Sequence, residues 1–150
     1  MSILIIQDNK SVRHDYHIIE TFEAGLVLMG SEVKAIRDRS IQLKDSYVAF
    51  KGHEAFLQNA HISEYKSSSY NNHHPERLRK LLLHKGELQK IFDALREKGL
   101  TCVCTKVYFK EGRVKIEIAL VKGKKLHDKR EAIKKRDVDN QLRRIKQHSR

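Results

Sequence analysis

Two histidine–aspartate pairs have the plainest capacity for chemistry in this sequence. His14-Asp15 and His127-Asp128 each resemble half of the signature of a metal-dependent phosphohydrolase. Such an enzyme needs further His and Asp ligands on facing helices, and no spacing in the sequence supplies that set. Nor is there a glycine-rich phosphate loop, a nucleophile elbow or an HExxH motif. We therefore expect a protein that is not an enzyme, with a phosphohydrolase acting through His14-Asp15 as an open alternative.

The adjacent histidines His73 and His74 and the two cysteines also lack the pattern of a metal site. His73-His74 lies in a stretch rich in Ser and Asn, where a chance pair is the simpler interpretation. Cys102 and Cys104 occupy positions i and i+2 of an expected strand, so their side chains share a face roughly 6.5–7 Å apart, a poor geometry for a disulfide. Two thiols cannot complete a zinc site alone. We interpret them as reduced packing residues of a cytoplasmic protein.

Positive charge is concentrated at the C-terminal end of the chain. The formal net charge is +12, and residues 122–150 alone carry 12 Lys/Arg against 4 Asp/Glu. This imbalance predicts a folded body with a basic tail and a polyanionic partner, with nucleic acid the leading candidate. An anionic membrane is a weaker candidate, because the tail lacks the aromatic and leucine-rich face of an interfacial helix. No apolar run is long enough to span a bilayer.

Three groups of residues are candidates for RNA contact from their types alone. Arg13, His14 and Tyr16 bring together a cation, an imidazole and a ring that could grip a phosphate and stack on a base. The equally weighted alternative is that the Tyr16 ring packs in the core. A second group, on one helix face, is Lys34 and Arg37, for which a solvated surface is the simpler interpretation. The strongest group is Lys122, Lys124 and Lys125, because like charges rarely gather beside a glycine without a function.

The chain before Lys122 alternates strand-like and helix-like segments. Apolar and β-branched runs predict strands over residues 3–6 (or a frayed end), 16–22, 26–29, 45–51, 55–63, 100–110 and 113–121, with 80–83 as a short buried segment. We expect a tight connection at residues 23–25 and a loop over 65–75. One helix is expected from an N-cap at Ser31, and a second follows an N-cap at His84, with Leu88, Ile91, Phe92 and Leu95 as its apolar stripe. These elements predict a mainly β protein with helices, a small antiparallel barrel of OB-like type.

Seven motifs, taken in order, resemble one known family. They are Arg13-His14-Asp15-Tyr16, Glu20-Thr21-Phe22-Glu23-Ala24-Gly25, Gly30-Ser31-Glu32-Val33-Lys34, Lys44-Asp45-Ser46-Tyr47, His61-Ile62-Ser63, Arg79-Lys80-Leu81-Leu82-Leu83-His84 and the run from Lys122 to Arg130. Any one of them is a weak signal. Together, in this order and spacing, they closely resemble the bacterial SsrA-binding proteins, also called small protein B, from about Asn9 to Arg150.

The resemblance implies a fold and a function. It implies a closed β-barrel with three helices, here over residues 1–125, and a basic C-terminal tail over 126–150 that is unstructured in solution. It implies binding to transfer-messenger RNA at the elbow of its tRNA-like part, and entry with that RNA into ribosomes stalled on truncated messages. This process, trans-translation, frees the ribosome and tags the unfinished peptide. The family is not enzymatic and needs no cofactor. We expect a monomer when free, with the ribosome as second partner and no membrane contact.

The family's functional residues carry over where the motifs match. Tyr16 and Glu23, with Leu82 and His84, would belong to the RNA face of the barrel, and Lys80 of the same motif is taken with them. Position 84 is commonly Asn in the pattern, which sets this chain apart. The N-terminal segment, residues 1–8, is also shorter and more apolar than is usual in the family, so no function is carried onto it.

The tail residues carry over in the same way. His127, Asp128, Lys129 and Arg130 would lie near the decoding centre of the ribosome. The residues that follow would enter the empty message channel as a helix, with Val138, Leu142 and Ile145 aligned on one face.

The runner-up interpretation is a ribosomal or general RNA-binding protein of barrel type, which shares the charge and the fold, and fold alone does not settle function.

Overall fold

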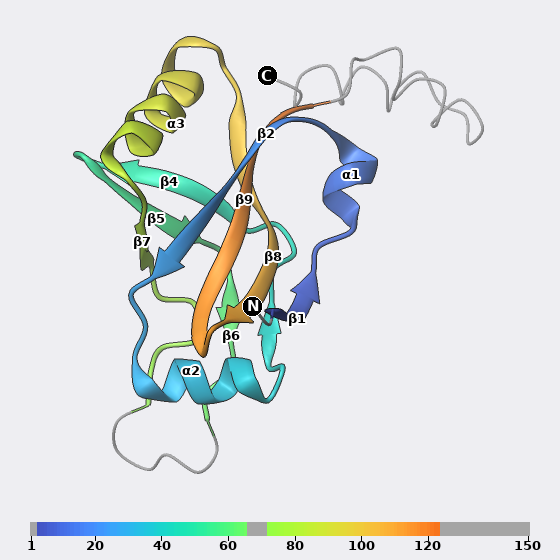
Figure 1. Ribbon diagram of the computed structural model, residues 1–150, viewed down its shortest axis with the longest axis vertical. Coiled ribbons are helices and arrows are strands. Elements are labelled where there is room, and N and C mark those ends of the chain that lie inside the picture. The colour runs from blue at the N-terminus through green and yellow to red at the C-terminus, as the bar shows by residue number, and fades with distance from the viewer. Residues whose placement is uncertain (1–2, 66–71, 124–150) are drawn as a thin grey trace.

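The structure is a computed structural model and describes residues 3–65 and 72–123 (Figure 1). Strands dominate this part of the chain, and three helices accompany them. The elements are β1 (Ile3–Asp8), α1 (Ser11–Asp15), β2 (Tyr16–Leu26), α2 (Gly30–Arg37), β3 (Ile41–Gln42), β4 (Tyr47–Lys51), β5 (Glu54–Gln58), β6 (His61–Ile62), β7 (Arg79–Leu82), α3 (Lys85–Glu97), β8 (Thr101–Lys110) and β9 (Arg113–Gly123). The prediction of a mainly β antiparallel protein with three helices is confirmed.

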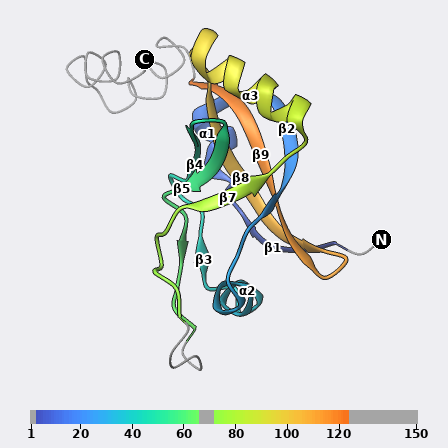
Figure 2. The ribbon, with the colours of Figure 1, turned by 90° about the vertical axis from the view of Figure 1, so that its left-hand side faces the viewer.

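The main sheet returns on itself. Its seven strands follow the order β1-β8-β4-β5-β7-β2-β9, every pairing is antiparallel, and β9 pairs again with β8. Six strands thus form a closed ring of pairings, to which β1 adds as an edge strand on β8, while β3 and β6 form a separate short ladder. Figure 2 shows α3 and α2 at opposite ends of these strands. No helix in the described ranges is long and apolar enough to cross a membrane.

The core lies inside the ring because the strands alternate. On β9 the residues Val114, Ile116, Ile118 and Leu120 are all buried, as the alternating sequence predicts. Burying each aliphatic side chain contributes on the order of 1.5–3 kcal/mol. Cys102 and Cys104 are fully buried free thiols, and burial raises the pKa of Cys102 to about 12. Their interpretation as packing residues is confirmed.

The expected turn at residues 23–25 is wrong. β2 runs unbroken through this segment and pairs with β9 from Tyr16 to Gly25. Gly25 also pairs with Leu82 of β7, so it lies between two neighbouring strands. A Cβ atom on Gly25 would come within 3.4 Å of the Leu82 Cβ and 3.7 Å of the Lys115 Nζ. The glycine therefore permits close approach of side chains and does not mark a reversal of the chain.

Three other helix and strand boundaries differ from those predicted from the sequence. The five-residue helix α1 was not predicted, because its single buried anchor, Val12, gives no periodicity. The cap of α2 is Met29, whereas Ser31 is buried and hydrogen-bonds His73 at 2.8 Å. The expected strand 55–63 is split into β5 and β6 at Asn59, which has a φ of 68°.

The second helix and the last hairpin follow the predictions closely. The backbone N–H of His84 donates to the Glu87 Oε1 at 3.2 Å, and this bond starts α3. Glu111 and Gly112 have φ of 53° and 78°, as a tight two-residue hairpin turn between β8 and β9 requires. At β7 the expected burial holds for Leu81 only, because Leu82 points outward and is 52% exposed.

A buried charge cluster ties α2 to β7. Glu32 and Arg79 are both fully buried, and the Arg79 Nε donates to the Glu32 Oε2 at 2.7 Å. Arg77 binds the other carboxylate oxygen, and the Met29 N–H donates to it at 2.8 Å. Burial by itself would raise the pKa of Glu32, but the hydrogen bonds from Arg77, Met29 and Arg79 outweigh burial and lower it. Arg79 also donates to the carbonyl oxygens of Ala60 and Pro75.

Replacing Glu32 with Gln should destabilise the fold strongly, because it leaves Arg79 buried without a counter-charge. We expect a loss of about 3–5 kcal/mol in the free energy of unfolding by urea at pH 7. Since the folded-state pKa of Glu32 is lowered, its stabilisation is present above the ordinary carboxyl range and is lost as the pH falls through the lowered value. The deficit of the variant should therefore shrink in acid.

The matched control is Glu76→Gln, since Glu76 is 63% exposed and pairs with the exposed His61. That change should stay within about 0.5 kcal/mol of wild type. Equal effects of the two substitutions, or a Glu32→Gln deficit that does not change with pH, would contradict the structural role of the buried cluster.

Candidate nucleic-acid interface

One groove on the outer surface of the ring gathers four of the residues predicted to bind RNA. Glu23 comes from β2, Lys80 and Leu82 from β7, and His84 from the start of α3. These elements meet because β2 pairs with β7, and α3 follows β7 directly. The Glu23 groove, as we call it, is lined by Glu23, Gly25, Lys80, Leu81, Leu82, Leu83, His84, Glu87, Leu88 and Lys115.

The Glu23 carboxylate is held by two neighbours from β8. The Tyr108 hydroxyl donates to the Glu23 Oε2 at 2.5 Å, and the Lys110 Nζ lies 3.3 Å from the Glu23 Oε1. The Tyr108 hydrogen bond lowers the pKa of Glu23 more than partial burial raises it, and Lys110 lowers it further. Burial raises the pKa of Tyr108, and so does its bond to Glu23. At neutral pH the groove therefore contains a fixed, ionised acceptor beside a cation.

A carboxylate in this setting can serve RNA in two ways. It can accept hydrogen bonds from base N–H groups, and it can orient the Lys110 ammonium towards a phosphate. Both roles need Glu23 ionised, which the Tyr108 bond favours. Sequence reasoning identified Glu23 by motif but not Tyr108 or Lys110, because the pairing of β2, β9 and β8 that brings them together is not local in sequence.

Lys115 is a third residue of this surface that sequence reasoning missed. It lies on an outward-facing position of β9, opposite Gly25, and its Nζ and the Leu82 side chain border the space that a Cβ on Gly25 would occupy. Next to it, a second hollow shares Gly25, Leu82 and Lys115 with the Glu23 groove and continues to Arg113 at the start of β9. The sequence did contain a signal for Lys115, namely the alternation of apolar and polar residues along this strand. A cation between the apolar residues Val114 and Ile116 is expected on the face of the strand that points away from the core.

Lys80 and His84 are oriented less rigidly than Glu23. The Lys80 Nζ lies 2.6 Å from the Glu54 Oε2, with the two side chains 44% and 52% exposed. Exposed pairs of this kind contribute little stability, so a phosphate can replace the carboxylate at small cost. The imidazole of His84 makes no capping hydrogen bond to α3 and is exposed, which leaves it accessible to a ligand.

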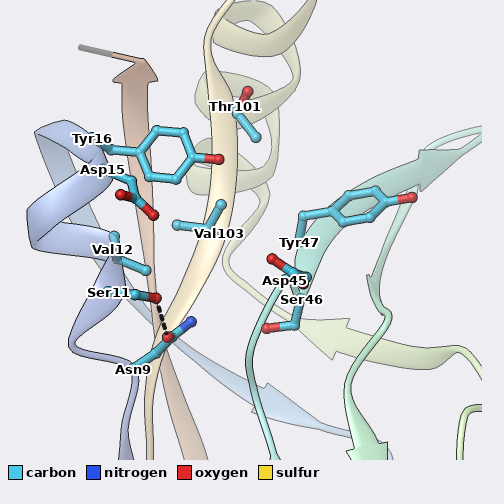
Figure 3. Close-up of a pocket in the computed structure, with 10 residues that line it drawn as sticks. All are labelled: Asn9, Ser11, Val12, Asp15, Tyr16, Asp45, Ser46, Tyr47, Thr101 and Val103. Carbon is cyan, nitrogen blue, oxygen red and sulfur yellow. Dashed lines mark hydrogen bonds between the residues drawn. The ribbon is translucent and has the colours of Figure 1, made fainter. Parts of the chain in front are cut away.

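The Arg13, His14 and Tyr16 cluster lies at the far end of β2 from Glu23. Tyr16 is half-buried, packs against Val12, Val103, Ala119 and Val121, and lines a pocket that Tyr47 flanks from β4 (Figure 3). Arg13 and His14 are exposed and pair with Asp8 and Asp15, at 3.9 and 3.0 Å. The structure thus gives the Tyr16 ring both a packing contact and an open pocket.

Tyr16 and Glu23 nevertheless share one face of the sheet. Tyr16 pairs with Gly123 of β9, and Glu23 pairs with Glu117. Because β2 has a bulge between Ile18 and Glu20, these two partners are an even number of residues apart on β9, although Tyr16 and Glu23 are an odd number apart on β2. Since even spacing on a strand keeps side chains on the same side, both residues lie on the outer face of the ring. The two clusters are therefore ends of one continuous surface.

The other predicted contacts lie away from the groove or outside the described residues. Lys34 and Arg37 are exposed on α2, where they cover the rings of Tyr65 and Phe109 at 5.7 and 4.8 Å. Lys122 is exposed on β9 and lies opposite His17 in the register of the β2–β9 ladder. The remaining predictions lie outside the described residues: Lys124, Lys125, His127, Asp128, Lys129, Arg130, Leu142 and Ile145.

The described residues offer no assembled metal centre. Within 3–65 and 72–123 no three His, Cys, Asp or Glu side chains are placed to share an ion. His14 and Asp15 hydrogen-bond each other at 3.0 Å on the surface, 81% and 57% exposed. In the described part of the chain, the pair that suggested a phosphohydrolase therefore stands without further ligands.

Comparisons with known proteins agree on one family. Residues 6–148 match the family model described as SmpB protein. The SsrA-binding protein of Bdellovibrio bacteriovorus is 69% identical over 142 residues, covering 95% of this chain and 93% of the relative. That of Persephonella marina is 54% identical over 142 residues, with the same coverage. A solved structure described as "tmRNA-SmpB: a journey to the center of the bacterial ribosome" superposes with a TM-score of 0.67 at 43% identity, covering 81% of this chain and 85% of that one.

Replacing Lys115 with Gln should weaken binding to transfer-messenger RNA, the ligand implied by the sequence resemblance. Losing one phosphate contact should also flatten the slope of log K against log salt concentration by about 0.7–0.9. Titrations at several salt concentrations measure both effects. The control is Lys98→Gln, which removes the same charge from the exposed end of α3. Equal losses in the two variants would show that only net charge matters and that the groove has no special role.

Proposed function

The chain belongs to the SmpB family, and from this premise we propose that it binds transfer-messenger RNA and brings it to stalled ribosomes for trans-translation. Two features support the proposal. The relatives are named SsrA-binding proteins, and the similar solved structure joins tmRNA, SmpB and the ribosome in its description. The protein acts by binding and not by catalysis.

The Glu23 groove carries this proposal. Glu23 is far in sequence from Leu82 and His84, yet all three match the family's RNA-face motifs and line a single groove together with Lys115. The groove combines a fixed anionic acceptor, exposed cations and an exposed apolar side chain, which suits a folded RNA with splayed bases better than a regular duplex. We place the elbow of the tRNA-like part of the RNA here.

The ring of strands is, in this proposal, the closed OB-like barrel of the family. Its support is the sheet order, in which β9 joins β8 to β2. The domain division follows: residues 1–125 form the RNA-binding barrel in the cytoplasm, and residues 126–150 form the tail. The protein is a monomer when free, with the RNA and the ribosome as its partners.

The tail has the second role. His127, Asp128, Lys129 and Arg130 act near the decoding centre, and the residues that follow enter the empty message channel as a helix. The basis is the charge of this segment, +8 over residues 122–150, together with the resemblance of its motif. Three apolar side chains cannot stabilise so short a helix in water, so rRNA supplies the missing contacts.

Truncation after Lys125 should separate the two roles. We expect the shortened protein to fold and to bind transfer-messenger RNA, because the barrel and the Glu23 groove are intact. Tagging of peptides on stalled ribosomes should be lost, since the residues assigned to the ribosome are absent. Tagging is measured in a reconstituted translation reaction with a truncated message. Tagging at the wild-type level would refute the division of labour, and dispersed binding to unrelated RNAs would favour the general RNA-binding interpretation.

A proline at Leu142 tests the proposed tail helix. Proline in a helix interior costs about 3 kcal/mol or more, because it removes a hydrogen bond and clashes with the preceding turn. Leu142→Pro should therefore impair tagging while leaving the affinity for free transfer-messenger RNA unchanged. The control Leu142→Ala shortens the same side chain without breaking the helix and separates loss of contact from loss of helix. Full tagging by the proline variant would exclude a helical tail as the working form.

A further inference from the structure

A second groove, on the far side of the start of α3, has no role in the interface described above. It lies between the β4–β5 hairpin and α3 and is lined by Phe50, His53, Lys85, Leu88, Gln89 and Phe92. We call it the aromatic groove. Phe92 was expected in the apolar stripe of the helix, but Ile91 and Ala94 are the buried residues of α3, and Phe92 is only half-buried at the edge of the core.

The two aromatic rings are held in a fixed arrangement. The ring centroids of Phe50 and Phe92 are 5.2 Å apart at an interplanar angle of 71°, an edge-to-face contact. The Arg96 guanidinium lies 5.7 Å from the Phe92 centroid. Rings fixed in this way can receive a planar group without the entropic cost of ordering them first.

Positively charged residues lie on the side of α3 that carries Phe92. Lys85, Gln89, Phe92 and Arg96 are spaced so that they share one side of the helix. Asp93 is engaged by the Gln89 side chain, whose Nε2 donates to the Asp93 Oδ1 at 2.8 Å. On another side of the helix, Lys90 pairs with Glu20 of β2 at 2.8 Å. Cations that flank half-buried aromatic rings along a groove are compatible with a surface that binds single-stranded nucleic acid.

The aromatic groove is continuous with the Glu23 groove. Leu88 lines both of them, and His84 of the first is followed in the chain by Lys85 of the second. An RNA strand seated against Glu23 and His84 therefore reaches Lys85 and Phe92 by crossing the first turn of α3. A protein segment docking by apolar contact would instead have to bury the ammonium of Lys85 and the guanidinium of Arg96.

We propose that the aromatic groove takes an unpaired base of the bound RNA, stacked against Phe50 and Phe92, with Lys85 and Arg96 at the flanking phosphates. The proposal rests on the proposed function, since the RNA is the transfer-messenger RNA of the Glu23 groove. It adds a second subsite to that ligand and makes α3 a direct RNA-binding element.

The absence of tryptophan from the chain gives a direct test. Phe92→Trp in the full-length protein places the single tryptophan of the chain in the aromatic groove, where it can be excited selectively over the five tyrosines, and Leu4→Trp places it on the exposed edge strand β1 as the control. Titration with transfer-messenger RNA should quench the tryptophan at position 92, because stacked bases quench indole emission, and should leave the one at position 4 nearly unchanged. Circular dichroism and thermal unfolding establish that both variants fold.

Affinity measurements complete the test. Phe92→Leu keeps an apolar side chain but removes the π face, and it should weaken RNA binding about fivefold, whereas Phe92→Tyr should bind like wild type. A role in packing alone predicts instead that Phe92→Leu lowers thermal stability and leaves affinity unchanged. The salt slope should not change for Phe92→Leu, since no charge is removed.

The outcomes separate this proposal from the one on which it rests. Wild-type protein that fails to bind transfer-messenger RNA overturns both. Wild-type binding with an unquenched tryptophan at position 92 and full affinity of Phe92→Leu overturns the aromatic subsite alone. Equal quenching at positions 92 and 4 also overturns it, because the effect is then nonspecific. Quenching by ribosomal proteins freed of RNA, and not by the RNA, would make the groove a protein-docking surface and the proposal wrong.

Discussion

Strand β9 pairs with β2 along one edge and with β8 along the other, and the candidate interface depends on this double pairing. Because β9 alternates between Val114 and Leu120, its even-numbered residues there fill the core while Lys115 and Glu117 lie on the opposite face. The same pairing brings Glu23 of β2 within reach of Tyr108 and Lys110 of β8, more than 80 residues away in sequence. The proposed binding surface is therefore the outer side of the strands whose inner side makes the core.

A second constraint fixes the end of the ring next to α2. Glu32 and Arg79 are buried without solvent access. Their charges are tolerated because Arg79 donates to the Glu32 carboxylate and to nearby backbone carbonyl oxygens, and Glu32 also accepts from Arg77 and the Met29 N–H. Arg79 is the first residue of β7, and Leu82 and His84 follow within five positions. An interaction that does not touch the groove thus sets where β7 starts and which of its residues face outward.

The sequence predicts those features that local patterns control. The alternation over 113–121 and the glycine turn before it predict the β8–β9 hairpin, and the capping pair with Gly99 predicts α3. Local patterns fail at Gly25, where a turn-like tripeptide lies inside a strand because two neighbouring strands hold it extended. For the same reason Tyr108 and Lys110 could not be assigned to the interface, since their neighbours are set by long-range pairing and not by spacing.

Two leucines permit the most direct test of the account. Leu82 in the Glu23 groove is 52% exposed and Leu4 on β1 is 54% exposed, so the two residues are matched in their access to solvent. Methyl NMR with a soluble paramagnetic agent measures that access before and after transfer-messenger RNA is added to the full-length protein. We expect the Leu82 methyls to become protected while the Leu4 methyls keep their exposure. Protection of Leu4 with Leu82 unchanged would contradict the claim that the Glu23 groove binds the RNA.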